Sequence, residues 1–304
     1  MTGRRQVTVA GRSLSVSNLD KVLYPATGTT KAEVLRYYLA VAEAMLPHLR
    51  GRPVTFRRFP DGVEAEGFYE KRCPDHRPPW VHTIPLGREG RDEAIEHCEL
   101  AGPADLAWAA NLGALELHVP MGRAPDPREP STVVFDLDPG APADVIDCAR
   151  LAMRLTELLD RLGVLGVPKT SGGKGLQVYV PINVPGTSYA TTRAFSLSVA
   201  RLLERATPEL VVTTQTKAAR RGKVLVDWSQ NHLTKTTVCA YSLRARPEPT
   251  VSTPLTWDEV DDAATARDAD ALRFDLDQVR ARVDAGGDRF AKVVTHRQEL
   301  PALG

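Results

Sequence analysis

The chain lacks the features that mark several large classes of protein. Its 304 residues contain no run of about 18 apolar residues, so we expect no membrane span and no membrane partner. No apolar core follows the first residues, as a secretory signal would require, so we expect a cytoplasmic protein. Low-complexity segments, internal repeats and long linkers are also missing. The net charge is only +1, which by itself does not indicate a polyanionic partner.

Cysteine is scarce and shows no standard redox or metal-binding spacing. The 4 cysteines lie far apart and form no CxxC, which argues against a thioredoxin-like motif and a zinc ribbon. One zinc alternative stays open, formed by Cys73, His76, His97 and Cys98, although their spacing fits no standard finger. The hydrophobic content of 42% and charged content of 25% are ordinary for a globular protein.

Apolar spacing predicts a succession of helices, strands and hairpins. Residues 5–17 fit a hairpin with Gly11 at the turn, and Thr30 with Glu33 fits a capping box before the first helix. The predicted helices span 31–49, 142–162, 188–206, 256–266 and 275–285. The predicted strands span 53–58, 67–71, 81–85, 115–119, 132–137, 164–169, 176–181, 211–213 and 224–227. This succession predicts an α+β (mixed α/β) fold, as one large domain over 1–304.

Two aspartates end the apolar stretch within 131–140. The β-branched run before them favours a strand, and residues two apart on a strand share a face, so Asp136 and Asp138 should project together. Two carboxylates at such a short distance repel each other. A divalent cation such as Mg²⁺ or Mn²⁺ usually compensates for this repulsion. The pair therefore indicates metal-assisted phosphoryl chemistry. A polar strand end or a helix cap is the alternative.

The chain contains its own control for this motif. Phe274-Asp275-Leu276-Asp277 repeats the same four letters, but no β-branched run precedes it and no Pro-Gly turn follows. We therefore expect Asp275 or Asp277 to cap a helix. The first copy is therefore a candidate site because of the sequence around it, since the four letters alone occur twice.

A glycine-rich loop, Ser171-Gly172-Gly173-Lys174-Gly175, leads into the strand predicted at 176–181. Glycines let backbone N–H groups approach an anion closely, and Lys174 adds a positive charge. The loop is not a Walker A motif, because Pro168 stands where the first glycine belongs and Gly175 follows the lysine. A phosphate-binding loop and an ordinary hairpin turn both fit this stretch.

Other polar residues fit the same chemistry. Asp227 ends an apolar run and is either a third metal ligand or a plain strand-end residue, and His118 lies in a predicted strand, where most histidines are half-buried structural residues. Two basic clusters hold phosphates or form solvated surface: Arg50, Arg52, Arg57 and Arg58, and Lys217, Arg220, Arg221 and Lys223. Two metal ions held by Asp136, Asp138 and Asp227 would serve nucleotidyl transfer.

These motifs resemble the polymerase domain of bacterial ATP-dependent DNA ligase D, in the archaeo-eukaryotic primase superfamily. The resemblance covers roughly residues 6–292 and rests on the stretches 18–25, 135–139, 171–176 and 226–231. It implies a primase-polymerase fold with an RRM-like catalytic sheet over about 131–304, after an N-terminal lobe over about 1–130 that carries DNA-binding elements. No ligase or nuclease module fits in this length, so we expect a stand-alone homologue.

The resemblance also implies site residues, each named here by its number in this chain. Asp136, Asp138 and Asp227 fall on the catalytic metal ligands for two Mn²⁺ or Mg²⁺ ions. The nucleoside triphosphate contacts are His118, Ser171, Gly173, Lys174, Gln177, Lys235 and Arg244. The pocket for a DNA 5′-phosphate is formed by Asn18, Lys21 and Lys31, which otherwise are a cap and two surface lysines. The template or DNA contacts are Phe68, Tyr69, Lys71, Lys217 and Arg220, of which the two aromatics are otherwise apolar strand contacts.

One position departs from the family pattern. Gln177 stands where the family usually has histidine, and a neutral amide replaces a group that can be cationic. We therefore expect weaker or rearranged triphosphate binding, in an enzyme that is still active because the aspartates and Lys174 are intact.

The function implied is template-directed primer extension and gap filling at DNA ends in non-homologous end joining or gap repair, with ribonucleotides favoured. The implied partners are gapped or broken DNA with a 5′-phosphate, nucleoside triphosphates, Ku and a separate DNA ligase, and the implied location is the nucleoid. A primase that starts chains de novo and a non-catalytic DNA-end bridging factor are the alternatives.

Overall fold

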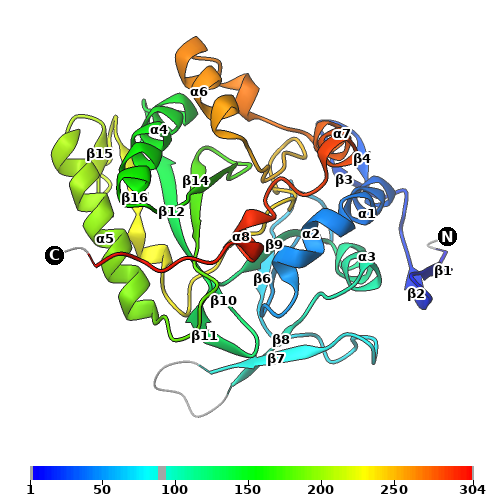
Figure 1. The fold of residues 1–304 in the computed structure, drawn as a ribbon. Coiled ribbons are helices and arrows are strands. Elements are labelled where there is room, and N and C mark those ends of the chain that lie inside the picture. The colour runs from blue at the N-terminus through cyan, green and yellow to red at the C-terminus, as the bar shows by residue number, and fades with distance from the viewer. Residues whose placement is uncertain (1–2, 88–93, 303–304) are drawn as a thin grey trace. The chain divides into compact units, whose positions relative to one another are not determined.

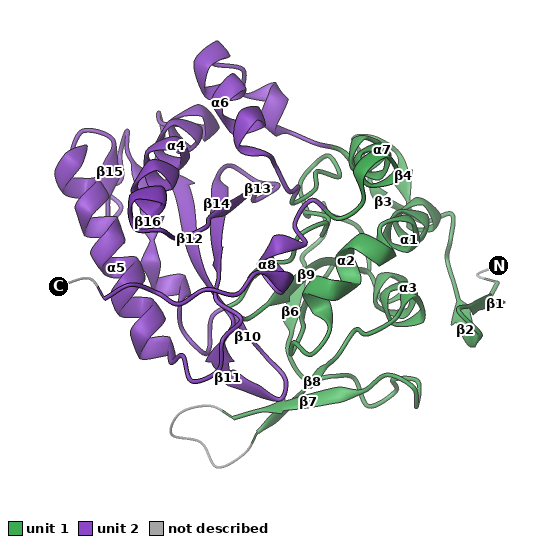
Figure 2. Cartoon of the chain, viewed as in Figure 1, with its two compact units in different colours: residues 1–120, 236–252, 275–288 green, residues 121–235, 253–274, 289–304 purple. Residues whose placement is uncertain are grey.

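The computed structural model describes residues 3–87 and 94–302, and the chain divides into two compact units. Unit 1 comprises residues 1–120, 236–252 and 275–288, and unit 2 comprises residues 121–235, 253–274 and 289–304 (Figure 2). Each unit is thus assembled from three separate stretches and is described by itself. Within the described residues, no helix is long and apolar enough to cross a membrane.

Unit 1 is built on a four-stranded antiparallel sheet in the order β17-β9-β5-β6. These strands are β5 (Thr55–Arg58), β6 (Phe68–Glu70), β9 (Ala114–Val119) and β17 (Thr237–Val238). Three small hairpins accompany the sheet: β1 (Arg5–Val9) with β2 (Arg12–Val16), β3 (Val22–Tyr24) with β4 (Thr29–Thr30), and β7 (Thr83–Leu86) with β8 (Ile95–Cys98). The helices are α1 (Lys31–Ala40), α2 (Ala42–Leu49), α3 (Pro103–Asn111) and α7 (Leu276–Gly286) (Figure 1).

The first predicted helix is in fact two helices. α1 begins with the predicted capping box, in which the Glu33 backbone N–H donates to Thr30 Oγ1 at 3.3 Å and the Thr30 N–H donates to the Glu33 carboxylate at 2.7 Å. The prediction of one continuous helix over 31–49 is wrong, because Val41 leaves helical geometry with φ −92° and ψ 4°. Val41 is β-branched, a class that loses side-chain freedom inside a helix.

The cysteine region also differs from the sequence expectation. Cys73 and Cys98 form a disulfide with Cα atoms 4.8 Å apart, which ties the segment after β6 to the end of β8. Both sulfurs are therefore consumed, and the zinc alternative for Cys73, His76, His97 and Cys98 is wrong in this structure. The His97 ring nitrogen Nδ1 instead lies 2.9 Å from the backbone carbonyl oxygen of Ile95.

Unit 2 contains a five-stranded sheet in the order β13-β14-β12-β16-β15. Its strands are β12 (Thr132–Pro139), β13 (Val167–Thr170), β14 (Leu176–Pro181), β15 (Val211–Val212) and β16 (Val224–Asp227); all neighbours are antiparallel except β15 and β16. The other elements are β10 (Gly122–Arg123), β11 (Asp126–Pro130), α4 (Val145–Arg161), α5 (Tyr189–Ala206), the 3₁₀ turns η1 (Trp228–Gln230) and η2 (Asp270–Leu272), α6 (Trp257–Ala266) and α8 (Lys292–Thr295).

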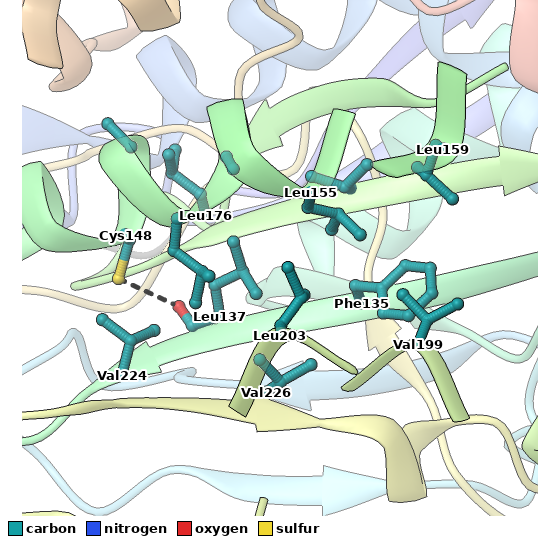
Figure 3. Packing of buried hydrophobic residues seen from close by; sticks show 14 of the residues in the cluster. Phe135, Leu137, Cys148, Leu155, Leu159, Leu176, Val199, Leu203, Val224 and Val226 are labelled. Carbon is teal, nitrogen blue, oxygen red and sulfur yellow. Dashed lines mark hydrogen bonds between the residues drawn. The ribbon is translucent and has the colours of Figure 1, made fainter. Parts of the chain in front are cut away.

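One face of this sheet is packed and the other carries the polar residues. Phe135 and Leu137 of β12 join a buried cluster with Leu155 of α4 and Val199 of α5 (Figure 3). Because side chains alternate along a strand, Asp136 and Asp138 project from the opposite face. The packed face therefore fixes the register that presents the two carboxylates.

The two copies of the Phe-Asp-Leu-Asp motif have different structures, as the sequence predicts. Asp136 and Asp138 lie inside β12, which continues through Pro139, so neither caps a helix. The N-cap of α4 is Asp144, whose Oδ1 accepts from the Ile146 backbone N–H at 2.8 Å. In the second copy Asp275 caps α7 and accepts from the Asp277 and Gln278 backbone N–H groups, which confirms the helix-cap prediction.

Candidate active site

Four polar residues form one row across the polar face of the unit 2 sheet. Lys169 of β13 lies opposite Gln177 of β14, Gln177 lies opposite Asp136 of β12, and Asp136 lies opposite Asp227 of β16. Directly opposed residues of antiparallel strands carry their side chains on the same face, with Cβ atoms about 4.5–5.5 Å apart. The sheet therefore brings together two carboxylates that are far apart in sequence, and Asp138 lies two residues along the same face of β12.

Hydrogen bonds run along this row in one direction. The Lys169 ammonium, which is fully buried, donates to Gln177 Oε1 at 2.6 Å, and Gln177 Nε2 donates to Asp136 Oδ1 at 3.0 Å. An ammonium has no acceptor, so the Gln177 oxygen must face Lys169 and its NH₂ group must face Asp136. The amide at the family's histidine position is thus held between a buried cation and a candidate metal ligand.

The carboxylates are crowded electrostatically. Burial raises the pKa of Asp136 to about 7, the charge of Asp138 and then that of Asp227 add to the rise, and the hydrogen bond from Gln177 opposes it. A carboxylate in this position holds its negative charge at a cost in free energy. A bound cation would remove that cost, because it replaces repulsion by attraction.

The donor set suits a hard divalent cation such as Mg²⁺ or Mn²⁺, since all three candidate ligands are carboxylates. In this structure Asp227 is engaged locally: Oδ1 accepts from Ser229 Oγ at 2.6 Å and Oδ2 accepts from Gln230 Nε2 at 3.0 Å. Across residues 3–87 and 94–302, no three His, Cys, Asp or Glu side chains are already arranged around a metal position. The three carboxylates fit a divalent cation in their chemistry and in strand register.

The glycine-rich loop closes directly beside β12. The Ser171 N–H donates to the Gly175 carbonyl oxygen at 2.9 Å, and Ser171 Oγ accepts from the Gly173 and Gly175 N–H groups at 3.2 Å each. A Cβ on Gly175 would lie 2.0 Å from the Leu137 carbonyl oxygen, so only glycine permits this approach. The loop leaves Gly173 and Lys174 exposed next to the strand that bears the aspartates.

The loop that carries the second basic cluster, which includes Lys217, Arg220 and Lys223, lies beside the end of β12, on the side of β16. The Gly140 N–H donates to the Lys223 carbonyl oxygen at 2.8 Å, and the Gly222 N–H donates back to the Gly140 carbonyl oxygen at 2.8 Å. A Cβ on Gly140 would lie 2.0 Å from the Arg220 carbonyl oxygen. The loop with Arg220 and exposed Lys217 therefore flanks the end of β12, while Lys235 is exposed after η1.

Unit 1 holds the other predicted nucleotide contacts. His118 is buried, and its Nε2 lies 2.8 Å from Glu116 Oε2. Arg244 Nε lies 3.3 Å from Glu116 Oε1, which is an ion-pair distance without hydrogen-bond alignment. The donors that surround Glu116 hold its pKa at about 2 despite its burial. His118 and Arg244 thus meet on one carboxylate.

The predicted template contacts lie on β6, the edge strand of the unit 1 sheet. Phe68 and Tyr69 are the most exposed aromatics of the described residues, at 45% and 60%. Adjacent strand residues point to opposite faces, so the two rings lie on different sides of β6. Each is covered by an arginine, with Arg58 5.2 Å from the Phe68 ring centre and Arg57 5.5 Å from that of Tyr69. Lys71 follows the strand and is half-buried.

The predicted 5′-phosphate residues are joined by the backbone before α1. The Lys21 N–H donates to the Asn18 carbonyl oxygen at 3.0 Å, and the Lys31 N–H donates to the Lys21 carbonyl oxygen at 2.8 Å. Lys21 Nζ pairs with Asp61 at 2.6 Å, and buried Lys31 donates to the Ser17 carbonyl oxygen at 2.8 Å. Burial and the nearby Lys21 charge lower the pKa of Lys31 to about 8. The two ammonium groups therefore repel, which a phosphate between them would relieve.

Sequence reasoning missed two buried charged residues of these clusters. Glu116 precedes His118 by two positions in a predicted strand, and this same-face spacing is the signal that identifies it. Lys169 occupies the strand position that faces Gln177, which only the register of β13 on β14 reveals.

Comparison with known proteins identifies the family. The family model of the LigD primase-polymerase domain matches residues 30–290. The multifunctional non-homologous end joining protein LigD of Mycolicibacterium smegmatis is 43% identical over 278 residues, which cover 91% of this chain and 35% of that protein. The bifunctional LigD of Bacillus subtilis is 34% identical over 288 residues, which cover 95% of this chain and 45% of that protein. The chain thus spans less than half the length of these curated relatives.

A solved structure agrees over nearly the whole chain. The polymerase domain from Mycobacterium tuberculosis ligase D, in complex with DNA, superposes with a TM-score of 0.86 at 40% sequence identity, covering 94% of this chain and 99% of that domain. The expected mixed α/β primase-polymerase fold is therefore confirmed, and so is the resemblance stated from the motifs. The chain belongs to the LigD primase-polymerase domain family.

Proposed function

We propose that this chain is a template-directed nucleotidyltransferase that extends primers and fills short gaps at DNA ends, as in non-homologous end joining or gap repair. The observation that carries the proposal is the pairing of Asp136 opposite Asp227, with Asp138 on the same face of β12. Family membership supports the same activity, since the matched relatives are named for end joining and the solved domain holds DNA.

The cofactors are two Mn²⁺ or Mg²⁺ ions held by Asp136, Asp138 and Asp227. When bound, such ions supply charge neutralisation and activation of the attacking hydroxyl. The chain's own residues position the substrates: the loop at Ser171 and Lys174 offers N–H groups and an ammonium to the triphosphate, which is a catalytic role of orientation and electrostatics. Gln177 orients Asp136 rather than serving as a cationic phosphate contact.

The substrates are nucleoside triphosphates, with ribonucleotides favoured, and gapped or broken DNA that carries a 5′-phosphate. Lys21 and Lys31 form the phosphate pocket with Asn18, because a terminal dianion suits paired ammonium groups. Lys217 and Arg220 hold the DNA backbone, and the exposed Tyr69 ring offers a stacking surface that tolerates any base. Ku and a separate DNA ligase are the protein partners, and the cytoplasmic nucleoid is the location.

Primer extension on a gapped duplex tests this function. The gap is prepared with and without a downstream 5′-phosphate and is offered ribonucleotides or deoxyribonucleotides with Mn²⁺ or Mg²⁺. We expect extension into the gap that the 5′-phosphate stimulates and that ribonucleotides support best. Synthesis on an unprimed template would favour the primase alternative, and DNA binding without extension under every condition would favour the bridging factor.

A further inference from the structure

One buried carboxylate in unit 1, that of Glu116, is contacted by four groups that donate hydrogen bonds or carry positive charge. Glu116 is 1% exposed, and its Oε1 accepts from Arg57 Nη1 at 3.1 Å and from the Ala245 backbone N–H at 3.0 Å. His118 lies at Oε2 and Arg244 at Oε1, at 2.8 Å and 3.3 Å. Three hydrogen-bond donors and the Arg244 guanidinium, from β5, β9 and the segment after β17, thus converge on one side chain.

The strand register explains this convergence. Glu116 and His118 are two apart on β9 and share a face. Arg57 of β5 lies opposite Glu116 on one side and opposite Tyr69 of β6 on the other. The Tyr69 ring also contacts the His118 ring, with centres 5.8 Å apart. The candidate nucleotide contacts and the exposed aromatic are therefore linked through Glu116 and Arg57.

The contact also fixes the protonation pattern of His118. A carboxylate only accepts, so the His118 nitrogen that faces it, Nε2, must carry the proton. Burial lowers the pKa of His118 and the bond to Glu116 opposes this, so the neutral ring offers its other nitrogen, Nδ1, as an acceptor. Without Glu116, nothing in this contact would distinguish one tautomer or one ring orientation from the other.

We infer that Glu116 is a positioning residue for the nucleotide, which holds His118 in one tautomer and Arg244 in one rotamer before the triphosphate binds. The inference rests on the proposed function and on the assignment of His118 and Arg244 as nucleotide contacts. Glu116 itself is buried beneath these groups and acts through them. Through Arg57, the same carboxylate couples the orientation of Tyr69 to the nucleotide contacts.

Only an acceptor-only group can satisfy all of these donors while it holds His118 in the tautomer protonated at Nε2. In Glu116→Gln the shape is kept, but one oxygen becomes an NH₂ group. At the Oε1 position this group would meet only donors, from Arg57, Arg244 and the Ala245 N–H, and at the Oε2 position only the other tautomer of His118, with Nε2 unprotonated, could accept from it. Loss of hydrogen bonds to charged groups of this kind costs about 1.5–3 kcal/mol, which corresponds to about tenfold to hundredfold in an equilibrium constant.

The test compares Glu116→Gln with Glu70→Gln as a matched control. Glu70 pairs with Arg58 at 3.0 Å on the same sheet, without contact to His118 or Arg244 in the described interactions. Nucleotide affinity is measured directly by calorimetry with Mn²⁺ and a non-hydrolysable ribonucleoside triphosphate, and KM and kcat are measured by primer extension. We expect Glu116→Gln to weaken nucleotide binding by about tenfold to hundredfold, and Glu70→Gln to bind the nucleotide as the parent does.

Two further readouts separate positioning from a structural role. The pKa of His118, followed by NMR, should fall in Glu116→Gln because the carboxylate that opposes burial is gone. In a His118→Ala, Arg244→Ala background the added Glu116→Gln change should have no further effect on nucleotide binding. If Glu116→Gln has a much lower melting temperature than the parent, Glu116→Asp replaces it in the test. This variant keeps an acceptor-only group and should show a smaller loss of nucleotide affinity.

Parent-like nucleotide binding together with an unchanged His118 pKa in Glu116→Gln would overturn the inference. An undiminished Glu116→Gln effect in the background without His118 and Arg244 would overturn it as well. A parent protein that neither binds nucleotide nor extends primers would instead overturn the proposed function, while the His118 pKa shift would still report the Glu116 contact.

Discussion

Asp136 of β12 lies directly opposite Asp227 of β16, in an antiparallel pair whose register continues from Leu137 with Val226 to Pro139 with Val224. Two like charges that face each other across a sheet destabilise it. The packed residues that alternate with the aspartates, Leu137 and Val226 among them, hold the strands in this register nonetheless. The carboxylates of Asp136 and Asp227 therefore repel each other in the folded protein, and such concentrated charge is typical of functional sites, including those that bind cations.

The stability of the metal-free protein should depend on pH through Asp136. Burial and the charge of Asp138 raise the pKa of this carboxyl to about 7 from its ordinary value of 3.8, so the folded state binds its proton more tightly than the unfolded state. Stability is then greatest below about pH 4 and falls as the pH rises through about 7. The loss is on the order of a few kcal/mol at most, because Asp136 is only half-buried and solvent screens part of the repulsion.

Thermal melts in EDTA between pH 4.5 and 8 check this slope. Asp136→Asn should melt at a higher temperature than the parent at pH 8 and show a shallower fall with pH. Added Mn²⁺ should raise the melting temperature of the parent far more than that of Asp136→Asn. Equal slopes for the two proteins would show that Asp136 does not carry the repulsion.

The hydrogen-bonded chain from Lys169 through Gln177 to Asp136 predicts a non-additive pair of substitutions. Gln177→Leu removes one hydrogen-bond acceptor of a fully buried ammonium, and loss of this charged hydrogen bond should cost about 1.5–3 kcal/mol of unfolding free energy. Adding Lys169→Met to Gln177→Leu removes that buried charge. The double variant should therefore be more stable than Gln177→Leu alone. Urea denaturation of the parent, both single variants and the double variant measures the cycle. A double variant less stable than Gln177→Leu would contradict the assigned pairing.

Recognition of a DNA 5′-phosphate should weaken at moderately alkaline pH. The pKa of Lys31 is lowered to about 8, so this ammonium loses its proton between about pH 7 and 9, unlike an ordinary lysine. We expect the preference for a 5′-phosphorylated gap over an unphosphorylated gap to fall several-fold across this range. Lys31→Arg, which stays charged, serves as the control and should keep its preference in fluorescence binding assays. A parent preference that is constant from pH 7 to 9 would argue against Lys31 as a phosphate contact.

The Cys73–Cys98 disulfide predicts sensitivity to reduction. Removal of a native crosslink of this kind typically costs about 2–4 kcal/mol. A reducing agent should therefore lower the melting temperature of the parent but leave a Cys73→Ser, Cys98→Ser double variant unaffected. Cys148→Ser, at a buried free cysteine, is the control that should still respond. Stability that falls with chelators but resists reduction would restore the zinc alternative.

The elements around the carboxylates were predictable from the sequence because their patterns are local. The sequence alone shows the β-branched runs of β12 and β16 and the wide apolar face of α4. The structure contains all three elements. The helix α3 was missed because nearly all of its residues are buried, so it has no polar face to set a helical period. The break between α1 and α2 likewise depends on packing that the apolar spacing does not record.

The contacts of the site depend on strand register, which single stretches of sequence do not contain. The three aspartates, the glycine-rich loop and Gln177 are visible as motifs, yet the order of β13, β14, β12 and β16 decides that Lys169 faces Gln177. Glu116 was missed beside His118, although a same-face spacing of two residues was present. The pairing of Cys73 with Cys98 links chain segments 25 residues apart and has no sequence spacing that signals it.

The most direct test of the account compares two aspartates from the two copies of the same four-letter motif. Asp136→Asn and Asp277→Asn are assayed for primer extension on a 5′-phosphorylated gap with Mn²⁺, after both are shown to fold. Asp136 faces Asp227 in the sheet, whereas Asp277 is exposed in the first turn of α7 and pairs only weakly with Arg280 at 3.4 Å. We predict that Asp136→Asn loses at least about hundredfold in rate and that Asp277→Asn extends as the parent does. An Asp136→Asn protein with parental extension would contradict the carboxylate site on which the proposed function depends.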